Sequence, residues 1–332
     1  MTVLTTYEAI NKAEWGALIA HSQTATWFQT PEAYLFFAGQ PELFTPFVFA
    51  VGNGQISALC TGYITRETNA LKHFFTRRAI IIGGPVIADN ASQDEVRTLL
   101  LTVRNALKTK AIYIETRNFN DFSTWREAFT QAGFHYEPHL NFHVDTTSLD
   151  CVNDNLSKNR KRDILTSLRD GVTILEQPTL AQVIDFYRII QKLYSTKVKT
   201  PLFPQSFFEQ LYNHPQGRFL LVELNGQIIS GIAAVELPKK CLYEWFVAGM
   251  DGTFKHIFPS SVATYAGLRY AAEHHIPRFD MMGAGTPDNA YGVRDFKARF
   301  GGKEVEHGRF KYIANPLLYK LGEWGVKILK KK

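Results

Sequence analysis

Two stretches of the chain show the same order of apolar and polar positions. Residues 47–64 and residues 219–237 each contain an apolar strand, an Asn-Gly pair and a second apolar strand. Asn-Gly is a strong hairpin signal because both residues tolerate the positive φ angles of a tight turn. The pattern therefore predicts one β-hairpin in each half of the chain.

The elements predicted after the two hairpins also correspond. In the first half a strand, a helix over about residues 93–108, a strand and a helix over about 122–132 follow the hairpin. In the second half the order is a strand, a helix over about 260–274, a strand and a short helix over 291–302. The two halves therefore read as two copies of one α+β unit, with the boundary near Asp150.

This order of elements is that of the GNAT-type N-acyltransferase fold, although many other α+β domains share it. We expect an α+β protein with two tandem GNAT-like (acyl-CoA N-acyltransferase) domains and mixed central sheets. Domain 1 would comprise residues 1–150 and domain 2 residues 151–315. A short basic amphipathic C-terminal helix over residues 316–332 would follow.

The predicted helix YGVRDFKARFGG, residues 291–302, has one apolar face and ends at a glycine pair. This pattern does not require Lys297, which sits beside Phe296 on the neighbouring face. The corresponding helix of the first half has Phe129 at the position of Phe296, and Thr130 where Lys297 stands. The lysine is thus either part of a solvated basic face or a residue with a chemical role.

The strand before this helix carries a second set of candidates. Asp280 has apolar neighbours and is either a base or a cap for nearby backbone, and we favour the cap. Gly283 and Gly285 follow the strand, where glycines allow a ligand or another backbone to approach closely.

Two other segments have residues suited to a ligand. In the predicted helix over 155–171, Arg160 shares the apolar stripe, so it needs either a buried carboxylate or an anionic ligand as counter-charge. In the strand over 242–249, alternation places Tyr243 and Trp245 on one face, which suits a core or a ligand wall.

Composition narrows the functional classes. Three cysteines, Cys60, Cys151 and Cys241, show no pairing or metal-ligand spacing, which favours a reducing compartment. The chain has no P-loop, no G-x-G-x-x-G and no apolar run long enough to span a membrane, and its N-terminal residues do not resemble a signal peptide. The net charge of +6 favours polyanions only weakly.

The C-terminal segment has an apolar stripe beside lysines. Its apolar residues are Leu317, Leu318, Leu321, Trp324, Ile328 and Leu329. The segment could either dock on the core of the protein or lie on an anionic membrane surface.

Three segments together resemble the Fem family, the peptidoglycan bridge-forming aminoacyltransferases and their FemAB-like relatives, which are built from two GNAT-type domains. They are WFQTPEAY, FSTWREAFTQAGFHYEPHLNFHVD and RFDMMGAGTPDNAYGVRDFKARFGG. The resemblance covers nearly the whole chain and is most specific over residues 280–302. Characterised members transfer an amino acid from aminoacyl-tRNA to a peptide amine of a cell-wall precursor at the cytoplasmic side.

The resemblance implies roles for the candidates. Lys297 would lie beside the scissile ester carbonyl and stabilise the negative charge of the tetrahedral intermediate. Phe296 would pack against the donor. Arg160, Arg294 and Arg299 would contact phosphate or RNA, and Tyr243, Trp245, Asp280, Gly283 and Gly285 complete the expected binding residues.

The chain also departs from the family pattern. Family members often carry a phosphate-binding lysine where this chain has Phe36 and Phe37, and the usual glycine pair is Gly283-Ala284 here. These departures weaken the case for the usual nucleotide-linked muropeptide as acceptor. They do not affect the expected transfer chemistry.

We therefore expect a cytoplasmic aminoacyltransferase without a cofactor, which uses aminoacyl-tRNA as co-substrate and a peptidoglycan precursor as acceptor, with peripheral contact at the inner face of the membrane. One alternative is an acyl-CoA-dependent N-acyltransferase acting on an amino sugar or a small amine. Another is a non-catalytic protein that binds tRNA or membrane. The oligomeric state is left open.

Overall fold

The protein is described by a computed structural model that covers residues 1–67, 75–288 and 292–331. Tyr291, the first residue of one predicted helix, and Lys332 lie outside the described residues. The chain forms two compact units. Unit 1 comprises Met1–His139 together with Glu306–Lys332, and unit 2 comprises Leu140–Val305.

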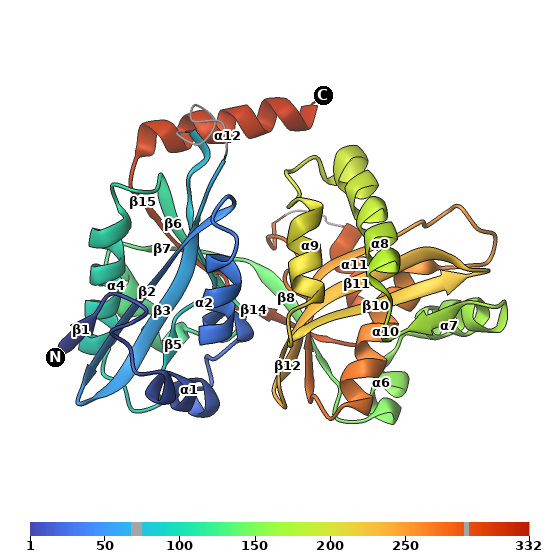
Figure 1. Ribbon diagram of the computed structural model, residues 1–332, viewed down its shortest axis with the longest axis horizontal. Coiled ribbons are helices and arrows are strands. Elements are labelled where there is room, and N and C mark those ends of the chain that lie inside the picture. The colour runs from blue at the N-terminus through green and yellow to red at the C-terminus, as the bar shows by residue number, and fades with distance from the viewer. Residues whose placement is uncertain (68–74, 289–291, 332) are drawn as a thin grey trace. The chain divides into compact units, whose positions relative to one another are not determined.

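Unit 1 is built on one mixed sheet (Figure 1). The strands lie in the order β1-β2-β3-β4-β6-β15-β7, and β5 pairs with β3. The pair β4 and β6 is parallel, whereas β2 and β3 form the predicted antiparallel hairpin. The elements are β1 (Thr2–Leu4), α1 (Lys12–His21), η1 (Trp27–Gln29), α2 (Pro31–Ala38), β2 (Phe44–Asn53), β3 (Gln55–Thr65), β4 (Ala79–Gly83), β5 (Val86–Ile87), α4 (Gln93–Leu107), β6 (Tyr113–Asn118), η2 (Ser123–Trp125), α5 (Arg126–Gln131), β7 (His135–Glu137), β15 (Arg309–Ile313) and α12 (Pro316–Lys331).

Helices α4 and α5 cover one face of this sheet, and α1 and α2 pack against the β2–β3 hairpin on the other (Figure 1). Helix α4 begins with a capping box in which Ser92 and Glu95 satisfy each other's backbone N–H groups. Its apolar stripe faces the core, because Val96, Leu100 and Val103 are fully buried. The helix predicted here is thereby confirmed.

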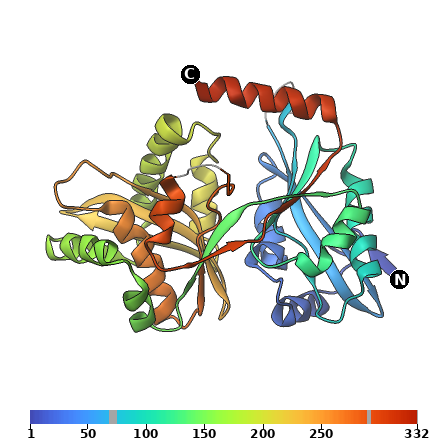
Figure 2. The same ribbon diagram turned by 180° about the vertical axis from the view of Figure 1, so that it is seen from behind.

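Unit 2 has a second mixed sheet, in the order β14-β8-β13-β12-β11-β10-β9. The hairpin β10–β11 is antiparallel, whereas β12 and β13 run parallel. Helices α6, α7, α10 and α11 lie toward one face, and α8 and α9 toward the other (Figures 1 and 2). The elements are β8 (Leu140–Asp145), α6 (Leu149–Asn155), α7 (Lys158–Arg169), β9 (Thr173–Leu175), α8 (Leu180–Leu193), η3 (Tyr194–Val198), α9 (Gln205–Tyr212), β10 (Gly217–Leu224), β11 (Gln227–Leu237), β12 (Cys241–Gly249), α10 (Pro259–Glu273), β13 (Arg278–Asp280), α11 (Gly292–Ala298) and β14 (Lys303–Glu306).

The compact units differ from the predicted domains, which end at residues 150 and 315. The difference arises from two strands. Strand β8, placed in domain 1 by the sequence, pairs with β13 in the sheet of unit 2. Strand β15, placed in domain 2, lies between β6 and β7 in the sheet of unit 1 (Figure 2). The reason is that long-range strand pairing, unlike a hairpin, leaves no local signature in the sequence.

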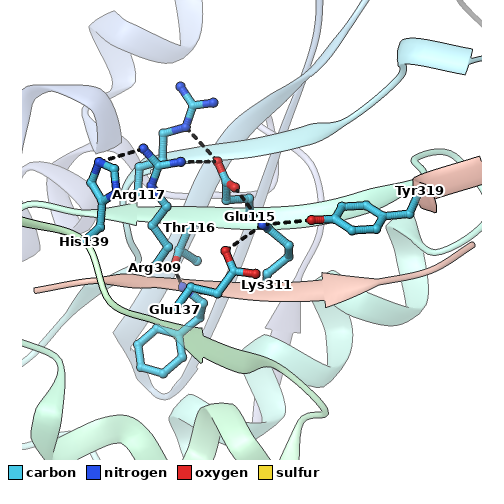
Figure 3. Close-up of polar contacts among 9 residues, drawn as sticks. Glu115, Thr116, Arg117, Glu137, His139, Arg309, Lys311 and Tyr319 are labelled. Carbon is cyan, nitrogen blue, oxygen red and sulfur yellow. Dashed lines mark hydrogen bonds and ion pairs between the residues drawn. The ribbon is translucent and has the colours of Figure 1, made fainter. Parts of the chain in front are cut away.

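A buried charge network ties β15 to its neighbours (Figure 3). The Glu115 side chain on β6 accepts hydrogen bonds from Arg117 at 2.9 Å and from Arg309 at 3.4 Å. Its second oxygen lies 3.5 Å from the ammonium of Lys311. Glu115 is only 4% exposed, and two of its three cationic partners, Arg309 and Lys311, come from β15.

The same network holds the start of α12. Lys311 also donates to Glu137 on β7 at 2.6 Å and to the Tyr319 hydroxyl at 3.2 Å (Figure 3). The Tyr319 ring packs edge-on against Tyr113, with the ring centroids 5.4 Å apart. One face of α12 is therefore attached to strands β6 and β15 of the unit 1 sheet.

Candidate functional site

Lys297 is buried in α11, with 7% of its surface exposed. Its ammonium donates hydrogen bonds to the carbonyl oxygens of Met281 and Gly283, the latter at 2.7 Å. These bonds use two of its three N–H groups, and among the described residues no atom accepts the third. Lys297 is therefore not part of a solvated basic face, which was one of the two interpretations of this helix.

The loop after β13 aims these carbonyl groups at Lys297. Met282 has a φ of 54°, and Gly283 and Gly285 have φ angles of 105° and 80°. Glycine adopts such angles readily, whereas for methionine they are uncommon and strained. The predicted glycines Gly283 and Gly285 thus shape the loop, and the strain at Met282 is of the kind that clusters at functional sites.

Asp280, which is fully buried, holds the start of this loop. Its carboxylate accepts hydrogen bonds from the Asn141 side chain at 2.8 Å and from the Met282 backbone N–H at 2.7 Å. The His143 ring lies 3.0 Å from its other oxygen. Burial raises the pKa of Asp280, but these contacts with His143 and Asn141 outweigh burial, so the net pKa is lowered. This bonding supports the structural cap favoured from the sequence.

Arg160 is buried against the helix that carries Lys297. It is 5% exposed, and its guanidinium lies 4.4 Å from the ring centroid of Phe296 and 4.5 Å from that of Phe300. It donates to the Ser261 hydroxyl and, at 3.3 Å, to the Phe296 carbonyl. No carboxylate pairs with it in the described part of the chain, and burial lowers its pKa to about 10. The rings and neutral oxygens therefore stand where a counter-charge was expected, and Arg160 links α7 to α11.

The other two predicted arginines lie at the surface. Arg294 donates to the carbonyl oxygens of Ala284, at 3.2 Å, and Thr286, and so braces the loop after β13. Arg299 is exposed. No side chain of the described residues pairs with the Arg299 guanidinium.

The aromatic strand β12 differs from the predicted alternation. Its pairing with β11 slips at Trp245, which forms a β-bulge. As a result Trp245 and Phe246 both contact Phe207 of α9, with ring centroids 5.2 Å and 6.2 Å apart. Tyr243 is fully buried. Tyr243 thus belongs to the core. Strict alternation would turn Phe246 to the face opposite Trp245, but the extra residue shifts the pleat, and both rings lie on the side of α9.

Glu244, on the same strand, was not selected from the sequence. Its side chain is 3% exposed, and one oxygen accepts a hydrogen bond from the Thr264 hydroxyl of α10 at 2.8 Å. Burial raises its pKa to about 7, although the charge of Lys297 acts in the opposite direction. An acidic residue in the middle of an otherwise apolar strand is a signal that could have identified it.

The described residues contain neither a metal-binding cluster nor a membrane-spanning helix. No group of His, Cys, Asp and Glu side chains there could hold a metal ion. None of the described helices is long and apolar enough to cross a membrane.

Comparisons with known proteins bear on the family and the fold of the chain. Residues 220–326, which include Glu244, Asp280 and Lys297, match the model of the FemAB family. The solved structure of FemX superposes with a TM-score of 0.73 and 14% identity, over 97% of this chain and 99% of FemX. No match was found among curated protein sequences.

Two further solved structures share the fold. The C-terminal domain of a putative lysylphosphatidylglycerol synthetase from Agrobacterium fabrum has a TM-score of 0.59 and 14% identity, over 96% of this chain and 95% of that one. A tandem GNAT protein from the clavulanic acid biosynthesis pathway has a TM-score of 0.56 and 11% identity, over 95% and 99%. The predicted α+β fold of two GNAT-like domains is confirmed, and so is the resemblance to the Fem family, through the FemAB match over residues 220–326 and the fold shared with FemX.

Proposed function

We propose that the protein transfers an amino acid from aminoacyl-tRNA to an amine of a peptidoglycan precursor, at the cytoplasmic face of the membrane. The match to the FemAB family and the fold of FemX support an acyltransferase. The observation that carries the proposal is the buried ammonium of Lys297, whose third N–H is accepted by no atom of the described residues and could serve a substrate.

The reaction needs a hydrogen-bond donor at the carbonyl oxygen of the ester. The acceptor amine attacks the ester carbonyl, a C–N bond forms, and negative charge develops on the carbonyl oxygen. The third N–H of Lys297 would stabilise that oxygen in a site from which water is largely excluded. The C–O bond of the ester then breaks, the tRNA hydroxyl leaves with a proton, and the attacking nitrogen releases one.

The choice of donor is tested with the purified protein and a peptidoglycan precursor as acceptor. Labelled aminoacyl-tRNA is expected to transfer its amino acid, and acetyl-CoA is expected to leave the acceptor unchanged. Deacylated tRNA serves as the control. Transfer from acetyl-CoA without any response to aminoacyl-tRNA would show the alternative, an acyl-CoA-dependent N-acyltransferase.

We infer in addition that α12 contacts an anionic membrane surface. Leu317, Leu321 and Trp324 are 77%, 54% and 65% exposed and lie at helical spacing on one face. The network around Lys311 and Tyr319 holds a different face of the helix. The sequence of the helix also supplies lysines, and an exposed apolar stripe beside lysines is typical of helices that lie in a lipid interface.

Replacing Leu317, Leu321 and Trp324 by serine in one variant is expected to reduce binding to anionic vesicles at least about tenfold. The reason is that these large apolar side chains no longer enter the lipid interface. Flotation with phosphatidylglycerol vesicles measures binding, and phosphatidylcholine vesicles test the need for charge. Leu165→Ser is the matched control, since Leu165 is 57% exposed on α7. Equal flotation of the triple variant and the wild type would remove the membrane role of α12.

A further inference from the structure

We propose that Glu244 is a positioning residue of the transfer site, whose carboxylate keeps Lys297 in the ammonium form that donates to the reacting carbonyl. This inference rests on the proposed function. It adds a residue to the site that the family resemblance did not supply. Glu244 acts here through Lys297 and needs no contact with substrate.

The surroundings of Glu244 are not those of a residue kept for packing. Its side chain is 3% exposed, and one carboxyl oxygen is bonded to Thr264. The other oxygen is buried without a hydrogen-bond partner among the described residues. A buried carboxyl oxygen without a partner costs stability, so an apolar residue would serve the core better at this position.

Three elements bring charged or polar groups to Glu244. Thr264 on α10 is the hydrogen-bond donor. Strand β12 pairs with β13 through Tyr243 and Asp280, so Glu244 follows beside Met281, whose carbonyl oxygen accepts a hydrogen bond from Lys297. Lys297 is the cation and Asp280 the second acid that act on the charge of Glu244. The oxygens of Asp280 are already occupied by other contacts. Glu244 is therefore the acid of this group that holds fewer contacts, and of the two acids it has the larger effect on the pKa of Lys297.

Glu244 and Lys297 each shift the pKa of the other toward the charged form. Burial lowers the pKa of Lys297, and Glu244 is the largest opposing influence, followed by Asp280. Burial raises the pKa of Glu244 to about 7. Above that pH Glu244 is an anion that stabilises the charge of Lys297.

The first test is the pH dependence of kcat/KM for the Glu244→Gln variant. Removal of the anion is expected to move the alkaline limb down by about one pH unit, so that kcat/KM falls by about three- to tenfold at about pH 8.5. At about pH 6.5, where Glu244 is largely neutral, the loss is expected to be below about threefold. Glu236→Gln on the neighbouring strand β11 is the matched control. Glu236 has its own cationic partner, Arg218, whose Nε lies 3.0 Å from the Glu236 carboxylate.

Two outcomes of that test would overturn the proposal. A uniform loss of activity with an unmoved alkaline limb would indicate a structural role. Loss of the acidic limb alone would indicate that Glu244 itself accepts the proton of the amine.

A second test needs no substrate. Unfolding of the Glu244→Gln, Lys297→Met and double variants gives the coupling between the two side chains. We expect coupling at about pH 8.5 that weakens at about pH 5.5, where Glu244 is protonated, and effects that add at both pH values would contradict the pair. If the coupling is present but no donor supports transfer, the proposed function fails while the pairing stands.

Discussion

Lys297→Met is expected to lower kcat by about 10²- to 10³-fold, the loss typical of removing one donor to a developing oxyanion. Methionine keeps the length and apolar character of the lysine stem but cannot donate a hydrogen bond. Since the contribution arises in the transition state, KM should change little. Steady-state transfer of labelled amino acid from aminoacyl-tRNA measures both constants.

The control for Lys297 is Lys303→Met, because Lys303 is exposed on β14, just after the helix that carries the catalytic candidate. This variant should retain the wild-type kcat. Circular dichroism of Lys297→Met must show a folded protein. A folded Lys297→Met variant that transfers at the wild-type rate would exclude Lys297 as the electrophilic residue.

Glu115→Gln is expected to lower the free energy of unfolding by about 3 kcal/mol at neutral pH. Burial alone would raise the pKa of Glu115, but Arg117, Arg309 and Lys311 lower it from 4.5 to about 2. Because the pKa in the folded state is depressed, this contribution is fully present above the unfolded pKa, near 4.5. It is lost as the pH falls from about 4.5 toward 2.

Urea unfolding at about pH 7 and about pH 3 measures this dependence. The difference in free energy of unfolding between the wild type and Glu115→Gln should be large at about pH 7 and smaller at about pH 3. Glu42→Gln, at an exposed position, should match the wild type at both. An equal gap at both pH values would show that shape, and not charge, determines the effect.

The local elements could be read from the sequence because their signals are local. Both Asn-Gly pairs form hairpin turns, and in the second pair Asn225 and Gly226 have φ angles of 52° and 76°. Helix α4 follows its capping box and its apolar stripe. These features depend on residues a few positions apart, so periodicity and turn chemistry suffice to predict them.

Strand partners could not be read in this way. Strand β15 lies between β6 and β7, nearly two hundred residues distant, for example with Phe310 opposite Thr116. The alternation along β12 also fails at Trp245, because the bulge depends on the register with β11. Both features are decided by pairing across the sheet.

Thr130 and Lys297 show which features of the candidate site follow from the sequence and which depend on the tertiary structure. The sequence by itself determined that two similar helices carry a threonine and a lysine at matching positions. The tertiary structure decided that Thr130 is exposed while Lys297 is buried, because a strained loop aims two carbonyl groups at its ammonium. Burial lowers the pKa of Lys297, and Glu244 on β12 opposes that shift. Burial and counter-charge depend on which segments meet in space, and these segments are far apart along the chain.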